Sequence, residues 1–285
     1  MKETLLGAAI IATISVVTII YITWKRKQHW LNQQAAVEQV FKVKKIIAMT
    51  QKHRGMCASF LQGKTETQSE LTQIVQTIHP IIEQLNTQKL IKQQDRWVGY
   101  QDHWGRLSKQ ATKLTLEESF QQHTNLITNL LYLFEDIAEQ QNISSTFFAD
   151  ANSSKTLWQT LPFAAEFIGQ SRAIGVAIAA KGTSTQVDKV KLGYLETKIN
   201  QLSQTVFKHF ADKRFSHPEH NQILKIAQES CQYFLALLHT ELLEVNKVTI
   251  APETYFEAAS KAMNGINRLL DNELQALKQQ VKKSY

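Results

Sequence analysis

The sequence contains few of the residues that interrupt helices or cross-link chains. Its 285 residues include only 10 glycines, 4 prolines and 2 cysteines. So few turn-forming residues argue against a sheet-rich fold, because sheets need frequent turns, and they favour long helices. The two cysteines, Cys57 and Cys231, cannot build a disulfide framework or a zinc site by themselves. Because both lie in apolar stretches, we expect them to be buried free thiols.

Several function classes lack a signal in this sequence. The formal net charge is +7, but the basic residues form no stripe with interleaved aromatic residues, and we predict no nucleic-acid partner. No glycine-rich phosphate loop and no arrangement of catalytic residues is evident, so we expect neither an enzyme nor a cofactor. His217 and His220 have a spacing that could share a metal ion, but no third ligand accompanies them, and we predict no metal site.

One long uncharged run lies at the N-terminus. Residues 4–24 contain no charged side chain, and at 1.5 Å per residue such a helix is long enough to cross a bilayer. Three basic residues, 25–27, follow directly, whereas a cleaved signal peptide would carry its positive charges before the apolar core. By the positive-inside rule we predict a single-pass anchor in the inner (cytoplasmic) membrane, with the bulk of the chain in the cytoplasm.

Behind the predicted anchor, apolar residues recur at helical spacing. The fourth helix is expected to open with the capping box Thr115-Leu116-Glu117-Glu118, and residues 142–154, rich in Ser, Asn and Asp, form the clearest break. We therefore predict an all-α chain, in which a transmembrane helix precedes eight helices that form two up-down four-helix bundles. The bundle halves are about 28–141 and 155–283, within one helical domain over 28–285. The eight helical stretches are about 28–61, 68–87, 89–113, 115–141, 155–181, 184–212, 217–245 and 249–283.

Two arginines stand on apolar helical stretches, one in each predicted half. Arg54 and Arg172 are both flanked by small and apolar residues, and a charge on such a face requires a partner, water or a ligand. Their matching positions predict a shared anion site. The alternative is that each pairs with a glutamate, such as Glu83 or Glu166, or extends its guanidinium to solvent.

Three segments, in order, resemble the nitrate- and nitrite-sensing (NIT) family. Gln51–Gly55 resembles the Gln-[Lys/Arg]-[Glu/His]-Arg-Gly signature, and Ile168–Gly175 is similar to the second family segment, Gly-x-x-Arg-Ala-x-Gly. Ala251–Ala259 resembles the third, a helix opening with Pro-Glu-x-[Trp/Tyr]-Phe. Together the three cover most of residues 35–280, and the family's fold is an all-helical pair of four-helix bundles.

The resemblance implies a sensor that binds nitrate, nitrite or another small anion through arginines and responds by helix rearrangement. Carried over by motif, Arg54 and Arg172 are the candidate ligands, and Lys52 stands where the family often has a second arginine. His53 replaces a frequent Glu. A guanidinium fork matches a planar oxyanion. We expect signalling through a separate output protein, with a homodimer as one possible assembly. The alternative is a membrane-anchored structural or interaction module that binds no ligand.

Overall fold

The computed structural model describes the backbone of residues 2–212 and 218–284 and the side chains of residues 10–211 and 219–284. Within these residues every regular element is a helix, and the sole β-type pairing is an isolated bridge between Thr183 and Lys247. The prediction of an all-α chain is confirmed.

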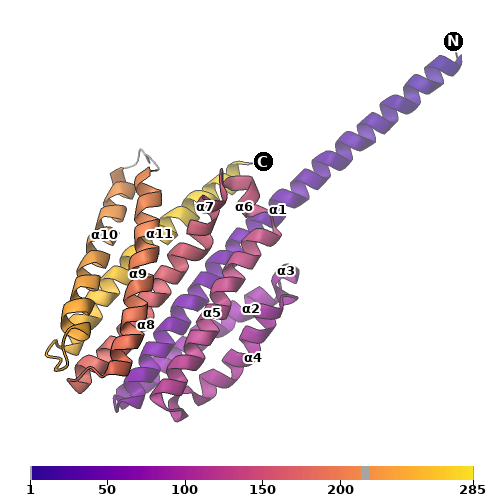
Figure 1. Cartoon of the computed structure of the whole chain (residues 1–285). Helices are drawn as coiled ribbons and strands as arrows, with labels where there is room; N and C mark the ends of the chain where they lie inside the picture. Colours follow the sequence, from indigo (N-terminus) through magenta and orange to yellow (C-terminus); the bar gives the residue numbers. More distant parts are fainter. Residues whose placement is uncertain (1, 213–217, 285) are drawn as a thin grey trace.

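The first half of the chain is organised around helix α1. This helix packs against α5 and α2, and α4 packs against α5 (Figure 1). Buried apolar residues of α5 form one stripe, from Leu126 to Ala138, because they recur at three- and four-residue spacing. The elements of this half are α1 (Lys2–Leu61), η1 (Thr65–Thr67), α2 (Gln68–Asn86), α3 (Lys89–Lys92), α4 (Asp95–Gln110), η2 (Ala111–Lys113) and α5 (Leu116–Gln140).

The second half contains four further long helices. Helix α8 packs against α11 and α9, and α10 packs against α11 and α9 (Figure 1). Two π-helical turns, which the sequence did not indicate, precede α8 and follow α10. The elements are η3 (Thr156–Thr160), α8 (Leu161–Lys181), α9 (Gln186–Asp212), α10 (Pro218–Leu238), η4 (His239–Leu243) and α11 (Pro252–Lys283).

Local signals place most helix boundaries correctly. The Thr115 side chain accepts a hydrogen bond from the Glu118 amide, and Glu118 accepts one from the Thr115 amide, which confirms the capping box. The predicted loop over 142–154 is wrong in detail, because it contains the short helices α6 (Ile143–Phe147) and α7 (Ala151–Lys155). His217 lies outside the described residues. The domain boundaries, 4–24 for the anchor and 28–285 for the helical domain, stay predictions.

The two halves meet along α1, α8 and α11. Helix α1 contacts both α8 and α11, and Lys44 forms an ion pair with Asp271 at 2.7 Å across the α1–α11 contact. Within the second half, the ring of Tyr255 occupies the space where a Cβ of residue 175 would stand, so Gly175 permits α8 and α11 to approach closely. The Tyr255 hydroxyl lies 3.0 Å from Ser171 Oγ. These contacts place Arg54 of α1 beside α8.

Helix α1 extends well beyond the bundles at its N-terminal end (Figure 1). Its residues 10–29 are exposed, and Trp30 Nε1 donates a hydrogen bond to the Val281 carbonyl of α11 at 2.8 Å. In the part of the chain that the structure describes, no helix is both long and apolar enough to cross a membrane. The structure therefore does not support the predicted anchor over 4–24, of which residues 4–9 lie outside the described side chains.

Candidate functional site

Both predicted arginines line one cavity where α1, α8 and α11 meet. The cavity has a volume of about 360 Å³, and Lys52 also lines it. We call it the arginine cavity. Its other polar lining residues are Gln51, Ser59, Gln62, Asn264 and Asn267. The structure thus brings together all three residues that the sequence singled out, from segments more than a hundred positions apart.

Arg54 is buried and pairs with a buried carboxylate. Its Nη1 lies 2.5 Å from Glu166 Oε1 and its Nη2 lies 3.2 Å from Oε2, which is a two-pronged ion pair. Glu166 also accepts hydrogen bonds from the amides of Gln51, at 2.8 Å, and Gln170, at 2.9 Å. Every oxygen of this carboxylate is therefore satisfied. Glu166 was one of the two glutamates considered as an internal partner for the arginines, and Arg54 pairs with it in the structure.

A glycine of the second motif makes room for the arginine of the first. A Cβ on Gly169 would lie 3.1 Å from Arg54 Nη2, tighter than ordinary van der Waals contact. Any larger residue at this position would push against the guanidinium and disturb its pairing with Glu166. The two sequence motifs therefore depend on one another physically, although each lies on its own helix.

Arg172 has a different environment. Its Nη1 donates to Ser260 Oγ at 2.9 Å, and its guanidinium carbon lies 4.9 Å from the centre of the Phe256 ring. Among the described side chains, no carboxylate lies within ion-pair distance of it. Burial, together with the positive charge of Arg54, lowers the pKa of Arg172, while Glu166 opposes that shift. Phe256 is exposed, with its ring against this guanidinium.

The buried charges around the cavity do not cancel. Arg54 and Glu166 neutralise one another, whereas Arg172 adds a positive charge without a carboxylate partner. Lys52 adds another at the cavity wall, but its side chain is half exposed and its ammonium lies 3.4 Å from Glu70. The cavity wall consequently has one partly desolvated positive charge in excess, which a monovalent anion would offset.

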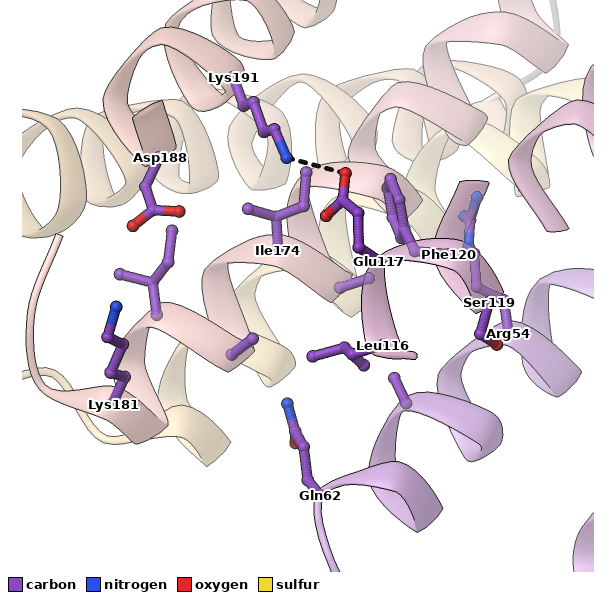
Figure 2. Close-up of a pocket in the computed structure, with 14 residues that line it drawn as sticks. Arg54, Gln62, Leu116, Glu117, Ser119, Phe120, Ile174, Lys181, Asp188 and Lys191 are labelled. Atoms are coloured by element: carbon purple, nitrogen blue, oxygen red, sulfur yellow. Dashed lines mark hydrogen bonds and ion pairs between the residues drawn. The ribbon is translucent and has the colours of Figure 1, made fainter. Parts of the chain in front are cut away.

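A second cavity lies on the other side of Arg54. It has a volume of about 280 Å³ and is lined by residues of α1, α5, α8 and α9, among them Ser119, Phe120 and Ile174 (Figure 2). An ion pair between Lys191 and Glu117, with 2.9 Å between nitrogen and oxygen, spans it from α9 to α5. Arg54 lines both cavities, as do Ala58, Gln62 and Ala173.

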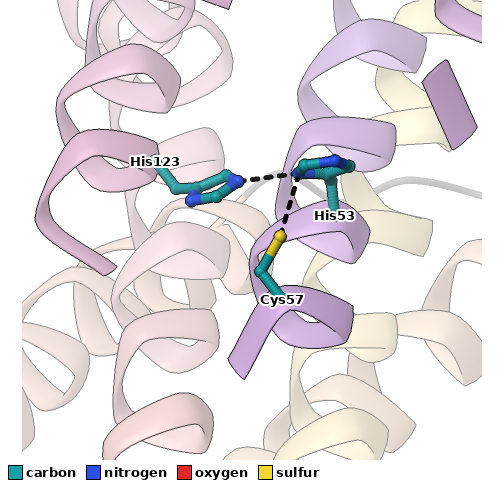
Figure 3. Close-up of side chains that lie close together, drawn as sticks. All are labelled: His53, Cys57 and His123. Atoms are coloured by element: carbon teal, nitrogen blue, oxygen red, sulfur yellow. Dashed lines mark hydrogen bonds between the residues drawn. The ribbon is translucent and has the colours of Figure 1, made fainter. Parts of the chain in front are cut away.

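Next to Arg54, three buried polar side chains converge (Figure 3). His53 Nδ1 lies 2.8 Å from His123 Nε2 and 3.5 Å from Cys57 Sγ. Burial lowers the pKa of His53 to about 4 and, with help from neighbouring positive charges, that of His123 to about 3. Burial also raises the pKa of the Cys57 thiol to about 12. Sequence reasoning missed this group; the four-residue spacing of His53 and Cys57 was its one local signal.

These features define an all-helical protein with a cation-lined cavity at the contact of its two halves. Residues 45–278 match the family model described as nitrate and nitrite sensing, NIT, and the chain belongs to that family. The family is a sensing family, and no comparison points to an enzyme. A search of curated proteins gives no match.

A solved structure has the same fold. The NasR transcription antiterminator superposes with a TM-score of 0.66 at 14% sequence identity, over 94% of this chain and 75% of that one. At this level of identity the likeness shows the fold alone. It agrees with the family assignment.

Proposed function

We propose that this protein senses nitrate or nitrite by binding the anion in the arginine cavity, with Arg172 as its principal ligand. The observation that carries the proposal is the uncompensated charge of Arg172 in a cavity that Arg54 and Lys52 also line. Binding one monovalent anion neutralises that charge. The family description supports nitrate and nitrite as the first anions to test.

The cavity wall suits a planar oxyanion. Arg172 uses Nη1 for Ser260 and keeps further N–H donors of its planar fork for a ligand. The amides of Asn264 and Asn267 line the same space and can donate as well. Charge-assisted hydrogen bonds contribute roughly 1.5–3 kcal/mol each. A few of them, after the entropic cost of association, are compatible with micromolar binding, which needs about 8 kcal/mol.

Arg54 has a second role in this proposal. Its guanidinium is held by Glu166 when the cavity contains no anion, and an anion beside it would compete with that carboxylate for the same donors. Such competition would change the contact between α1 and α8. Helix α1 is tied to α11 by the Lys44–Asp271 and Lys278–Glu38 ion pairs, so movement at the cavity would be passed along both helices.

Calorimetry with the full chain tests the binding step. Nitrate and nitrite should release or absorb heat with one site per chain, and Arg172→Gln should abolish the signal while the protein keeps its helical circular dichroism. The matched control is Arg106→Gln, which removes an exposed arginine paired with Asp102 on α4, far from the cavity lining. Unchanged nitrate binding in Arg172→Gln would refute the proposed ligand.

The second candidate function is a structural or interaction module without a ligand, and the internal Arg54–Glu166 pair favours it. In that case Arg54 serves only to hold α1 against α8. Thermal unfolding separates the two functions. A module without a ligand melts at the same temperature with and without nitrate, whereas a sensor gains stability as nitrate rises through its dissociation constant.

Membrane attachment and an output partner belong to the proposal as well. Two features support an N-terminal anchor: residues 4–24 contain no charge, and the basic residues 25–27 follow. The projecting part of α1 also exposes apolar side chains, which a bilayer would remove from water. The output protein is expected to be a separate chain. A periplasmic reporter enzyme fused after Tyr285 should be inactive, and activity there would contradict the cytoplasmic placement.

A further inference from the structure

Three potential metal ligands meet in the core between α1 and α5. His53 Nδ1, Cys57 Sγ and His123 Nε2 all lie within 4.8 Å of one another, and all three side chains are buried (Figure 3). No other group of three or more His, Cys, Asp or Glu side chains in the described residues has this geometry. A second buried cysteine, Cys231, has no such neighbours and contacts the Ala262 carbonyl at 4.0 Å.

Helix geometry accounts for the convergence. His53 and Cys57 are four residues apart, so they stand on the same face of α1, one turn from each other. That face is turned to α5, from which His123 approaches. Arg54 follows His53 directly, and its guanidinium pairs with Glu166 of α8 and donates to Thr124 of α5 at 3.1 Å. None of the three ligand residues lines the arginine cavity.

The Ser119 carbonyl fixes the direction of the hydrogen bonds in this pocket. His123 Nδ1 lies 2.6 Å from the Ser119 carbonyl, which can only accept, so Nδ1 carries the proton and Nε2 presents a lone pair. His53 Nδ1, 2.8 Å away, must then donate to that lone pair. The Cys57 thiol consequently faces an N–H rather than an acceptor at 3.5 Å. In the metal-free protein both Nδ1–H groups therefore have acceptors, and His123 Nε2 presents its lone pair toward His53.

The hydrogen bond from His123 to the Ser119 carbonyl is also the support that metal-binding histidines usually have. Such histidines donate their second ring N–H to a carbonyl or carboxylate, which fixes the ring and its tautomer. Here the bond directs Nε2 at His53 and Cys57. The ring is therefore already oriented as a ligand before any ion arrives.

From this arrangement we propose that His53, Cys57 and His123 form a three-coordinate binding site for monovalent copper. Two imidazoles and one thiolate are soft ligands of the kind that Cu⁺ prefers. A structural zinc site needs four ligands, and three are present. The thiolate and Cu⁺ together carry no net charge, which suits a pocket without solvent, whereas Zn²⁺ would leave a positive charge unpaired next to Arg54.

Binding requires a small movement of the two imidazoles, loss of the Cys57 thiol proton and a shift of the His53 ring proton. In a three-coordinate site, metal–nitrogen bonds of about 2.0 Å place the two ligand nitrogens about 3.5 Å apart, so the imidazoles must separate by roughly 0.7 Å. Cu⁺ replaces the proton of the Cys57 thiol, which is released to solvent, and the His53 proton moves from Nδ1 to Nε2. No electron is transferred. The cavity of Figure 2 reaches Ser119, one contact from His123, and offers a path of entry.

The test is an anaerobic titration of the reduced full chain with Cu⁺ against the chromophoric chelator bathocuproine disulfonate. The expected result is one Cu⁺ retained per chain, with Cys57→Ser and His123→Gln each weakening retention by more than about 100-fold, beyond the 10–100-fold typical of outer-shell changes. Cys231→Ser, which removes the other buried thiol, should retain copper as the unchanged chain does.

X-ray absorption spectroscopy of the copper-loaded, unchanged chain reports the atoms bound to copper and does not depend on how any variant folds. One sulfur and two nitrogen neighbours around copper are expected. No retained Cu⁺ in a folded sample, equal retention by Cys57→Ser, or a shell without sulfur would each overturn the assignment. Retention of Zn²⁺ in preference to Cu⁺ would overturn it too. Nitrate binding is measured separately, so failure here leaves the proposed anion site unaffected.

Discussion

The two halves of this protein treat their matching arginines differently. In the first half, Arg54 is buried and held by Glu166, next to the buried His53 and His123. In the second half, Arg172 rests against Phe256 and Ser260 without a carboxylate. Similar motifs therefore give one arginine a carboxylate partner and leave the other with a hydroxyl and an aromatic ring. The partner, rather than the motif, decides which role an arginine has.

The largest loss of stability is expected from a substitution in the first half. Arg54→Met removes one member of a buried ion pair and leaves Glu166 charged and enclosed, which costs about 3–5 kcal/mol. For a chain of this size the melting temperature should fall by roughly 10 °C. Circular dichroism melting checks this. Arg172→Met is the matched variant, and if it destabilises as much as Arg54→Met, the contrast between the halves is wrong.

A second effect follows from the buried histidines of the first half. Their pKa values in the folded protein, about 4 for His53 and about 3 for His123, lie below the ordinary 6.5. Between pH 6.5 and these lower values the unfolded chain binds more protons than the folded chain. The free energy of unfolding is therefore highest above pH 6.5 and decreases as the pH falls. We expect a loss on the order of 3 kcal/mol, summed over the two histidines, by pH 5.5 in metal-free protein.

Urea unfolding at several pH values measures that loss. The double variant His53→Gln, His123→Gln is the comparison, because neither glutamine titrates in this range. Its stability should depend less on pH than that of the unchanged chain. Equal slopes for the two proteins between pH 6.5 and 4.5 would show that other groups cause the acid sensitivity.

In the second half, we expect a loss of stability when the close contact between α8 and α11 is crowded. Gly175→Ala forces a methyl group into the ring of Tyr255 and should destabilise the protein by about 1–3 kcal/mol. Gly55→Ala is the control, since nothing lies within 4 Å of its added Cβ, and helix propensity should make it neutral or stabilising by up to about 1 kcal/mol. Thermal melts that rank the two variants the other way would contradict the close α8–α11 contact.

The smallest expected stability effect belongs to Arg172. Removing it breaks one hydrogen bond to Ser260 and an aromatic contact, and no buried carboxylate is left unpaired. Arg172→Gln should therefore lower stability by only about 1 kcal/mol in the absence of anions. Urea unfolding without nitrate checks this value. A loss comparable to that of Arg54→Met would mean that Arg172 has a structural role.

Much of the fold could be predicted from the sequence because its signals are local. Helix periodicity and the Thr115–Glu118 capping box depend on neighbouring residues, and the long helices lie where those signals placed them. The π-helical turns and the short helices α6 and α7 were missed, although Asp150 caps α7 by accepting a hydrogen bond from the Ser153 amide. Nor does helical spacing show that the exposed Phe256 lies against the Arg172 guanidinium.

The candidate site was predictable only in outline. Motifs could name Arg54, Arg172 and Lys52, and the fold brings these residues to one cavity. The choice of Glu166 as the partner of Arg54 depends on how α1 packs against α8, which spacing along one helix does not encode. His123 joins His53 and Cys57 across two helices for the same reason. Long-range packing determines these contacts.

The most direct test of the central claim is nitrate calorimetry on the unchanged chain, Arg172→Gln and Glu166→Gln. Glu166→Gln leaves both arginines without a carboxylate, so the excess buried charge rises from one to two. If that excess charge binds the anion, nitrate affinity should be highest for Glu166→Gln, intermediate for the unchanged chain and lost in Arg172→Gln. Equal affinities in all three folded proteins would contradict the account.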